Sequence, residues 1–265
     1  MSVLGFSDWF ALLAVIATLV PLVALQRWIH QHLHGIAFLL TRNREAAVLV
    51  YAVPLFPGVL LHELSHWVMA KLLFVRTGKM SLLPKRDRDG HIQLGSVTVE
   101  RADPVRSSLI GIAPLISGSL VVLYLGYRMF GVGALEGALR TGDIGVIVSR
   151  FVAMLGVQDM WLWLYLLFVV ANAMLPSPSD RETWPPVILF LTVMAGLAYL
   201  SGLSHVLNEL TPFAVTGLRW LAVAFAMTII VDLPFVALIA FAEWLFGSIG
   251  GQRVYYYQPP KRRRK

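Results

Sequence analysis

The stretch PGVLLHELSHWVMAKLL, residues 57–73, places two histidines and a glutamate inside an otherwise apolar segment. Residues four apart on a helix lie one turn above each other, so His62 and His66 can both direct a ring nitrogen at one metal ion. Glu63 then lies beside the ion without binding it, where it can move a proton from water to a leaving amine. The stretch therefore predicts a metal site on a membrane helix. The alternative is a hydrogen-bonded polar cluster that joins helices.

The composition around this stretch is that of a membrane protein. Of the 265 residues, 57% are hydrophobic and 14% are charged, and the mean hydropathy is +0.71. A soluble domain carries about 25% charged residues, so an ordinary soluble enzyme is excluded. The chain has no cysteine. Disulfides, thiolate ligands and a cysteine nucleophile are therefore excluded, and a metal must be held by His, Asp or Glu.

Six apolar segments are long enough to cross a membrane. The predicted fold class is an all-α polytopic membrane protein with about six transmembrane helices and a small β-hairpin between the second and third spans. Because Pro54 and Pro57 lie inside the second span, we expect the helix to break there and to restart at Pro57. The predicted spans are Trp9–Leu25, Ala46–Val75, Ser107–Phe130, Gln158–Pro176, Trp184–Leu203 and Arg219–Phe246.

The predicted hairpin lies in the polar stretch 76–106. Its central part, HIQLGSVTVE at 91–100, alternates weakly between apolar and polar residues and has Gly90 and Gly95 as turn residues. No repeat divides the chain, and we expect four parts in sequence. These are an N-terminal helix and loop (1–45), a core of three spans with the hairpin region (46–183), two C-terminal helices (184–250) and a basic tail (251–265).

Charge indicates the orientation of the chain and the kind of surface it meets. With both termini cytoplasmic, the cytoplasmic loops and tail hold fourteen Lys and Arg residues and the other side holds seven, which favours this orientation. The net charge of +7 would suggest nucleic acid for a soluble chain, but no nucleic-acid partner is expected of a membrane chain. The tail KRRRK, residues 261–265, is suited to anionic lipid headgroups.

A third metal ligand is needed, because catalytic zinc sites commonly take three protein ligands and leave the fourth position to water. The second and fourth spans cross in the same direction. The C-terminal end of the His62–His66 helix and the segment after the fourth span therefore lie on one side of the membrane. That segment is NAMLPSPSD, residues 172–180, and Asp180 is its candidate ligand.

These elements resemble the site-2 protease family of intramembrane zinc metalloproteases. In that family a HExxH helix is followed by a hairpin region, a span with a Gly-Pro-type motif, and a later span that ends in Asn, prolines and Asp. Here the matching segments are PGVLLHELSHWVMAKLL, residues 76–106, GIAPLISG at 111–118, and NAMLPSPSD. The resemblance covers nearly half the chain, with the elements in the same order.

The resemblance implies roles for single residues. His62, His66 and Asp180 would bind Zn²⁺, and Glu63 would be the general base. Asn172 would lie next to the site, although an interhelical hydrogen bond is an equal alternative for this residue. Pro114 and Ser117 belong to the second motif. Three positions depart from the family pattern: Ala113 stands where Gly is usual, Ser117 where Asn is usual, and Arg181 where Gly usually follows the Asp.

The implied activity is hydrolysis of peptide bonds in transmembrane or membrane-adjacent protein substrates. A helical substrate must unwind before cleavage, and an exposed strand edge can hold the unwound segment by β-augmentation. We assign this role to the hairpin residues Ser96, Val97 and Thr98, whose alternative is a plain surface loop.

Two other functions stay open. The departures at 113, 117 and 181 motivate a catalytically silent subunit that assembles with partner subunits of a larger membrane complex. An ion or proton transporter that uses Asp232, a carboxylate in the sixth predicted span, ranks last because no inverted repeat is visible. Metal content separates the transporter from the other two, and a comparison of the native chain with Glu63→Gln separates protease from subunit.

Overall fold

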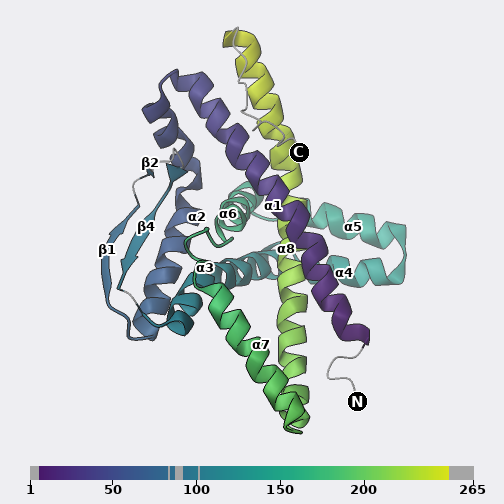
Figure 1. The fold of residues 1–265 in the computed structure, drawn as a ribbon. Helices are drawn as coiled ribbons and strands as arrows, with labels where there is room; N and C mark the ends of the chain where they lie inside the picture. Colours follow the sequence, from purple (N-terminus) through teal and green to yellow (C-terminus); the bar gives the residue numbers. More distant parts are fainter. Residues whose placement is uncertain (1–5, 83, 87–91, 101, 251–265) are drawn as a thin grey trace, which may run out of the picture.

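The computed structural model describes residues 6–82, 84–86, 92–100 and 102–250 (Figure 1). The basic tail, Gly90 and His91 lie outside the described residues. The described part is mostly helical. Its elements are α1 (Phe6–Thr41), α2 (Arg44–Leu72), β1 (Thr77–Ser81), β2 (Lys85–Arg86), β3 (Ile92–Gln93), β4 (Ser96–Val99), α3 (Pro104–Tyr124), the π-helical turn η1 (Leu125–Met129), α4 (Val132–Thr141), α5 (Ile144–Leu155), α6 (Met160–Ala173), α7 (Trp184–Leu200) and α8 (Ser204–Gly250).

Four helices, α1, α2, α3 and α8, are long and apolar enough to cross a membrane. A fifth crossing results if α5 and α6, which meet at 90°, are counted as one broken span. The membrane-type helical chain is thus confirmed, whereas the count of six spans is not. The predicted fourth span is the 14-residue α6, and the fifth is the 17-residue α7. At 1.5 Å per residue these helices are about 21 and 26 Å long, shorter than the hydrocarbon core of about 30 Å.

The first and last helices are longer than predicted. Helix α1 has 36 residues and α8 has 47, so they extend to about 54 and 70 Å. They pack against each other along the centre of the molecule (Figure 1). Leu22 of α1 and Phe225 of α8 are almost completely buried there, in one cluster with Val122 of α3 and Met174 after α6. The core that positions the site is therefore built from α1, α3, α6 and α8.

The expected break at Pro54 and Pro57 is absent, because α2 runs as one helix from Arg44 to Leu72. A proline removes the helical hydrogen bond to the carbonyl four residues earlier, here those of Val50 and Val53, and membrane helices tolerate such a loss. The helix packs against α6, where the Tyr165 hydroxyl donates to the carbonyl of Pro54 at 2.8 Å. The helix begins at an N-cap instead, where the Asn43 side chain accepts hydrogen bonds from two backbone amides.

The predicted β-structure is present, but the partner strand was predicted wrongly. Strand β4 pairs antiparallel with β1, with Met80 opposite Val97 and Ser81 opposite Ser96. A smaller ladder joins β2 and β3. The periodicity within 91–100 did not reveal the partner, because pairing depends on residues about twenty positions upstream. The β1–β4 sheet lies beside α2 (Figure 1).

Candidate metal centre

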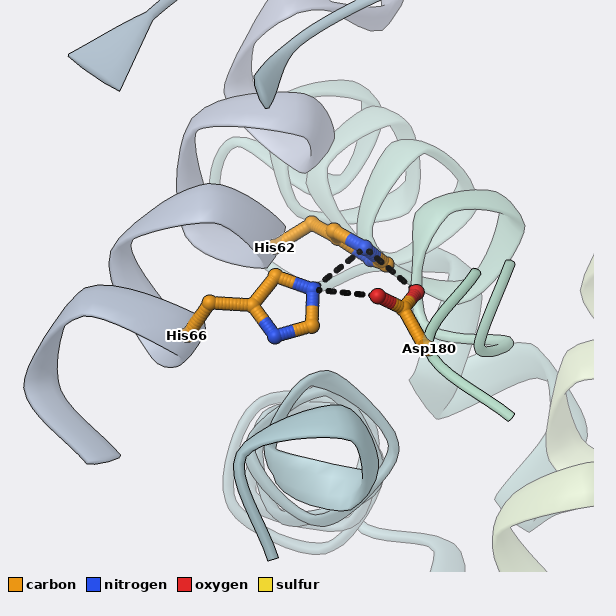
Figure 2. A group of neighbouring side chains, drawn as sticks. All are labelled: His62, His66 and Asp180. Carbon is orange, nitrogen blue, oxygen red and sulfur yellow. Dashed lines mark hydrogen bonds and ion pairs between the residues drawn. The ribbon is translucent and has the colours of Figure 1, made fainter. Parts of the chain in front are cut away.

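Three side chains from two distant parts of the chain converge at one point (Figure 2). His62 and His66 extend from α2, and Asp180 comes from the loop between α6 and α7. The two Nε2 atoms are 3.1 Å apart. The Asp180 carboxylate lies 3.6 Å from Nε2 of His62 and 3.3 Å from Nε2 of His66. The structure thus brings together the three ligands predicted from the sequence, as a group that could hold a metal ion.

These separations fit a small, four-coordinate ion. Zinc binds His nitrogen and carboxylate oxygen at about 2.0–2.2 Å, so two ligand atoms of a tetrahedral site lie about 3.3–3.6 Å apart. The two Nε2 atoms are 3.1 Å apart, and the carboxylate places Oδ1 at 3.3 Å from His66 and Oδ2 at 3.6 Å from His62. Each of the three residues can offer one ligand atom, and these atoms lie within 4.8 Å of one another. In a four-coordinate site, three protein ligands leave one position for water.

His62 is oriented by the end of α6. Its Nδ1 lies 2.6 Å from the carbonyl oxygen of Ala173, the last residue of that helix. A carbonyl only accepts, so Nδ1 carries the proton and Nε2 presents its lone pair to the ion. The last carbonyls of a helix have no partner within the helix, which makes them available to side chains. The two preceding carbonyls bond to Gln26 at 2.8 Å and to His30 at 3.2 Å.

His66 is oriented by a carbonyl that a proline leaves free. Its Nδ1 donates to the carbonyl of Ile110, at 2.9 Å. In an unbroken helix this carbonyl would accept from the backbone N–H four residues later, but that residue is Pro114, which has no N–H. Pro114 therefore acts through the backbone and is not a candidate ligand. Its effect is to expose the acceptor that fixes the tautomer of His66.

Asp180 is held by its own loop and by a close contact with α3. Its Oδ2 accepts from the backbone N–H of Ser177 at 2.7 Å. Burial opposes ionisation of the carboxyl, but the two histidines and the Ser177 hydrogen bond together outweigh it and keep the pKa of Asp180 well below its usual range. Gly111 lies against this loop, since a Cβ atom at that position would be 2.1 Å from the carbonyl oxygen of Asp180.

Glu63 lies next to the ligands but is not one of them. The side chain is buried, and the backbone of Val97 in β4 hydrogen-bonds to its carboxylate. A Cβ atom on Gly95 would lie 2.8 Å from Oε1 of Glu63, so the chain just before β4 approaches this carboxylate closely. Strand β4 therefore begins directly beside the carboxylate predicted to be the general base. Ser96 and Val97 are half-buried in this strand, and Thr98 is exposed.

Two predicted site-adjacent residues have other contacts. The Ser117 hydroxyl of α3 hydrogen-bonds to the Ser65 hydroxyl of α2 at 2.5 Å. Ser65 directly precedes His66, so this bond joins α3 to α2 next to a candidate ligand. The Asn172 amide donates to the Asp232 carboxylate of α8 at 2.7 Å, which is the interhelical alternative considered for it. Both residues thus position the helices that carry the site.

Sequence reasoning missed the carbonyls of Ile110 and Ala173 and the contact of Gly111. Pro114 signals the first, because a proline inside a helix leaves the carbonyl four residues earlier without its donor. The contact between Gly111 and Asp180 joins residues 69 positions apart, and no local pattern predicts it.

Comparisons of this chain with protein-family models, with curated proteins and with solved structures found no match.

Proposed function

We propose that this chain is an intramembrane zinc metalloprotease that hydrolyses peptide bonds of membrane-spanning or membrane-adjacent proteins. The observation that carries the proposal is the convergence of His62, His66 and Asp180, with Glu63 buried beside them. The donor set of two imidazoles and one carboxylate is one that catalytic zinc sites use. The motif resemblance described above supplies the reaction class.

The residues present can do the following chemistry. A bound zinc ion would acidify a water molecule and polarise a carbonyl group. Glu63 would take the proton of the attacking water and deliver it to the amine that leaves. Its side chain is 7% exposed, which limits its contact with bulk water during the proton transfer. The carbonyls of Ile110 and Ala173 keep both imidazoles in the tautomer that this arrangement requires.

Strand β4 supports the substrate-binding part of the proposal. In the β1–β4 sheet it is one of two strands, and it begins beside Glu63. An extended substrate segment that added to this sheet would present its peptide bonds near the base.

The test compares the native chain with Glu63→Gln. Glutamine keeps the size of the side chain but cannot accept the proton, so zinc content of the purified protein should be unchanged. Turnover should fall by about 10²-fold or more. Cleavage is read as new N-termini among membrane proteins of cells that produce either form. Equal sets of N-termini from the two forms would refute the proposed protease activity.

The second candidate is a silent assembly subunit built on the same metal centre. The engagement of Asn172 with Asp232 favours it, because this amide is committed to a structural hydrogen bond. If this candidate is correct, the chain should bind one equivalent of zinc and co-purify with stoichiometric partner subunits. Glu63→Gln should then have no effect on the processing of membrane proteins.

A further inference from the structure

Asp232 and Asn172 form a buried polar pair that the metal centre does not use. Asp232 of α8 has 0% of its surface exposed, and Asn172 near the end of α6 has 5%. The Asn172 amide donates to Asp232 Oδ1 at 2.7 Å and to the Phe168 carbonyl at 3.0 Å, so both amide hydrogens are used. Asn172 Oδ1 and Asp232 Oδ2 are buried and have no hydrogen-bond partner within the described part of the chain.

An ionised Asp232 would be an isolated charge inside the protein. Among the residues that the structure describes, no Lys, Arg or His forms an ion pair with it. His30 bonds to the backbone carbonyl of Asn172 and to Tyr51. Burying an unpaired charge is far more costly than burying a neutral acid. A proton on the carboxyl removes the charge and supplies a donor for Asn172 Oδ1, the unpartnered acceptor on the side chain that Asp232 already contacts.

The pair lies at the end of α6, where the metal centre obtains its orientation. Asn172 precedes Ala173, whose carbonyl holds His62, and the Asp180 loop begins a few residues later. Gln26 and His30 hold the neighbouring carbonyls from α1. Asp232 is the side chain that ties the same helix end to α8.

We propose that Asp232 is a positioning residue for the metal centre. As a neutral acid it makes two hydrogen bonds with Asn172, and these fix the end of α6 that carries the Ala173 carbonyl. This inference rests on the proposed function, because it assumes that the three ligands hold an ion.

The test measures Co²⁺ affinity and the Co²⁺ absorption spectrum for the full-length chain in detergent. In Asp232→Asn the amide can both accept from and donate to Asn172, as the neutral acid does, so affinity should stay within about twofold of the native value. Asp232→Leu removes both hydrogen bonds, and affinity should fall about tenfold or more, the size of effect known for outer-shell groups. Thr228→Val is the matched control. Thr228 lies one turn earlier on α8 and is equally buried, and its hydroxyl donates to the Ala224 carbonyl of its own helix.

Three affinity results would overturn the inference. Loss of affinity in Asp232→Asn equal to that in Asp232→Leu would show that the negative charge is required. Native affinity in Asp232→Leu would show that the pair positions nothing. Equal losses in Thr228→Val and Asp232→Leu would indicate general weakening of α8.

A second measurement does not depend on metal. The infrared difference spectrum of the native chain minus Asp232→Asn at neutral pH should contain the carbonyl band of a protonated carboxylic acid. Its absence would overturn the neutral pair. If the native chain binds no Co²⁺, the proposed function and the positioning role fail together, and the infrared band still decides whether the neutral pair exists.

Discussion

Replacement of Gly111 by alanine should damage the metal centre without touching a ligand side chain. A Cβ atom on residue 111 would lie 2.1 Å from the carbonyl oxygen of Asp180 and 3.0 Å from its carbonyl carbon. Real Cβ contacts are almost never shorter than 3.0 Å, so α3 and the Asp180 backbone must separate by about 0.9 Å. The close atoms belong to the backbone, so a side-chain rotation cannot relieve the contact.

The size of the effect follows from the length of a metal–ligand bond. A carboxylate binds zinc at about 2.0–2.2 Å, so a shift of about 0.9 Å removes Asp180 from coordination or forces the two histidines to follow. We expect zinc affinity and turnover each to fall by about 100-fold, since a 1 Å misplacement can cost that much in rate. Helix propensity acts in the opposite direction, because alanine favours a helix over glycine by about 1 kcal/mol.

The assay is competition for zinc between the purified chain and a chromophoric chelator. Gly196→Ala is the control, because Gly196 lies in the apolar helix α7 and an added Cβ there would have no neighbouring atom within 4 Å. It should bind zinc as the native chain does. If Gly111→Ala also binds zinc within about threefold of the native affinity, the close packing of α3 against the Asp180 loop is refuted.

Three further predictions concern the other contacts of the site. Pro114→Ala restores an N–H that competes with His66 for the Ile110 carbonyl, so zinc affinity should fall about tenfold. The thermal midpoint should rise, because a proline inside a helix costs about 3 kcal/mol. Unchanged zinc affinity in a chelator competition would contradict this prediction. In Gly95→Ala the added Cβ would lie 2.8 Å from Oε1 of Glu63, so turnover should fall about tenfold with zinc content unchanged. Loss of zinc, measured by elemental analysis, would count against the placement of Glu63 beside the ion. Zinc at about 1,000 times its Kd adds about 4.1 kcal/mol to the free energy of unfolding. It should therefore raise the unfolding midpoint of the native chain by several degrees and leave that of Asp180→Ala unchanged. Equal shifts in the two proteins would show that zinc binds at another site.

Much of the candidate site could be predicted from the sequence because its parts have local signatures. The spacing of His62 and His66 is a helical repeat, and their apolar surroundings place them in a membrane-type helix. The predicted order of the spans, with the second and the fourth crossing in the same direction, indicated Asp180 as the candidate third ligand. These inferences depend on the spacing of residues along a helix and on the direction of the predicted spans, and both can be read from the order of residues.

The helix ends and strand partners were predicted less well, because they depend on contacts between distant segments. Helix α2 continues through Pro54 and Pro57 where it packs against α1, α3 and α6. Strand β4 pairs with β1 across more than a dozen intervening residues. The count of six spans is not confirmed, because α6 has 14 residues and α7 has 17, both shorter than a helix that crosses the hydrocarbon core.

The sequence by itself determined that this is a helical membrane-type chain with two histidines on one helix face and a carboxylate that can reach them. Only the tertiary structure decided how these groups are held: by the Ile110 and Ala173 carbonyls and by the Gly111 contact. The physical reason is that the sequence does not show which distant segment a backbone carbonyl or a glycine will contact. Its effect depends on which segment of the folded chain lies within hydrogen-bonding or van der Waals distance.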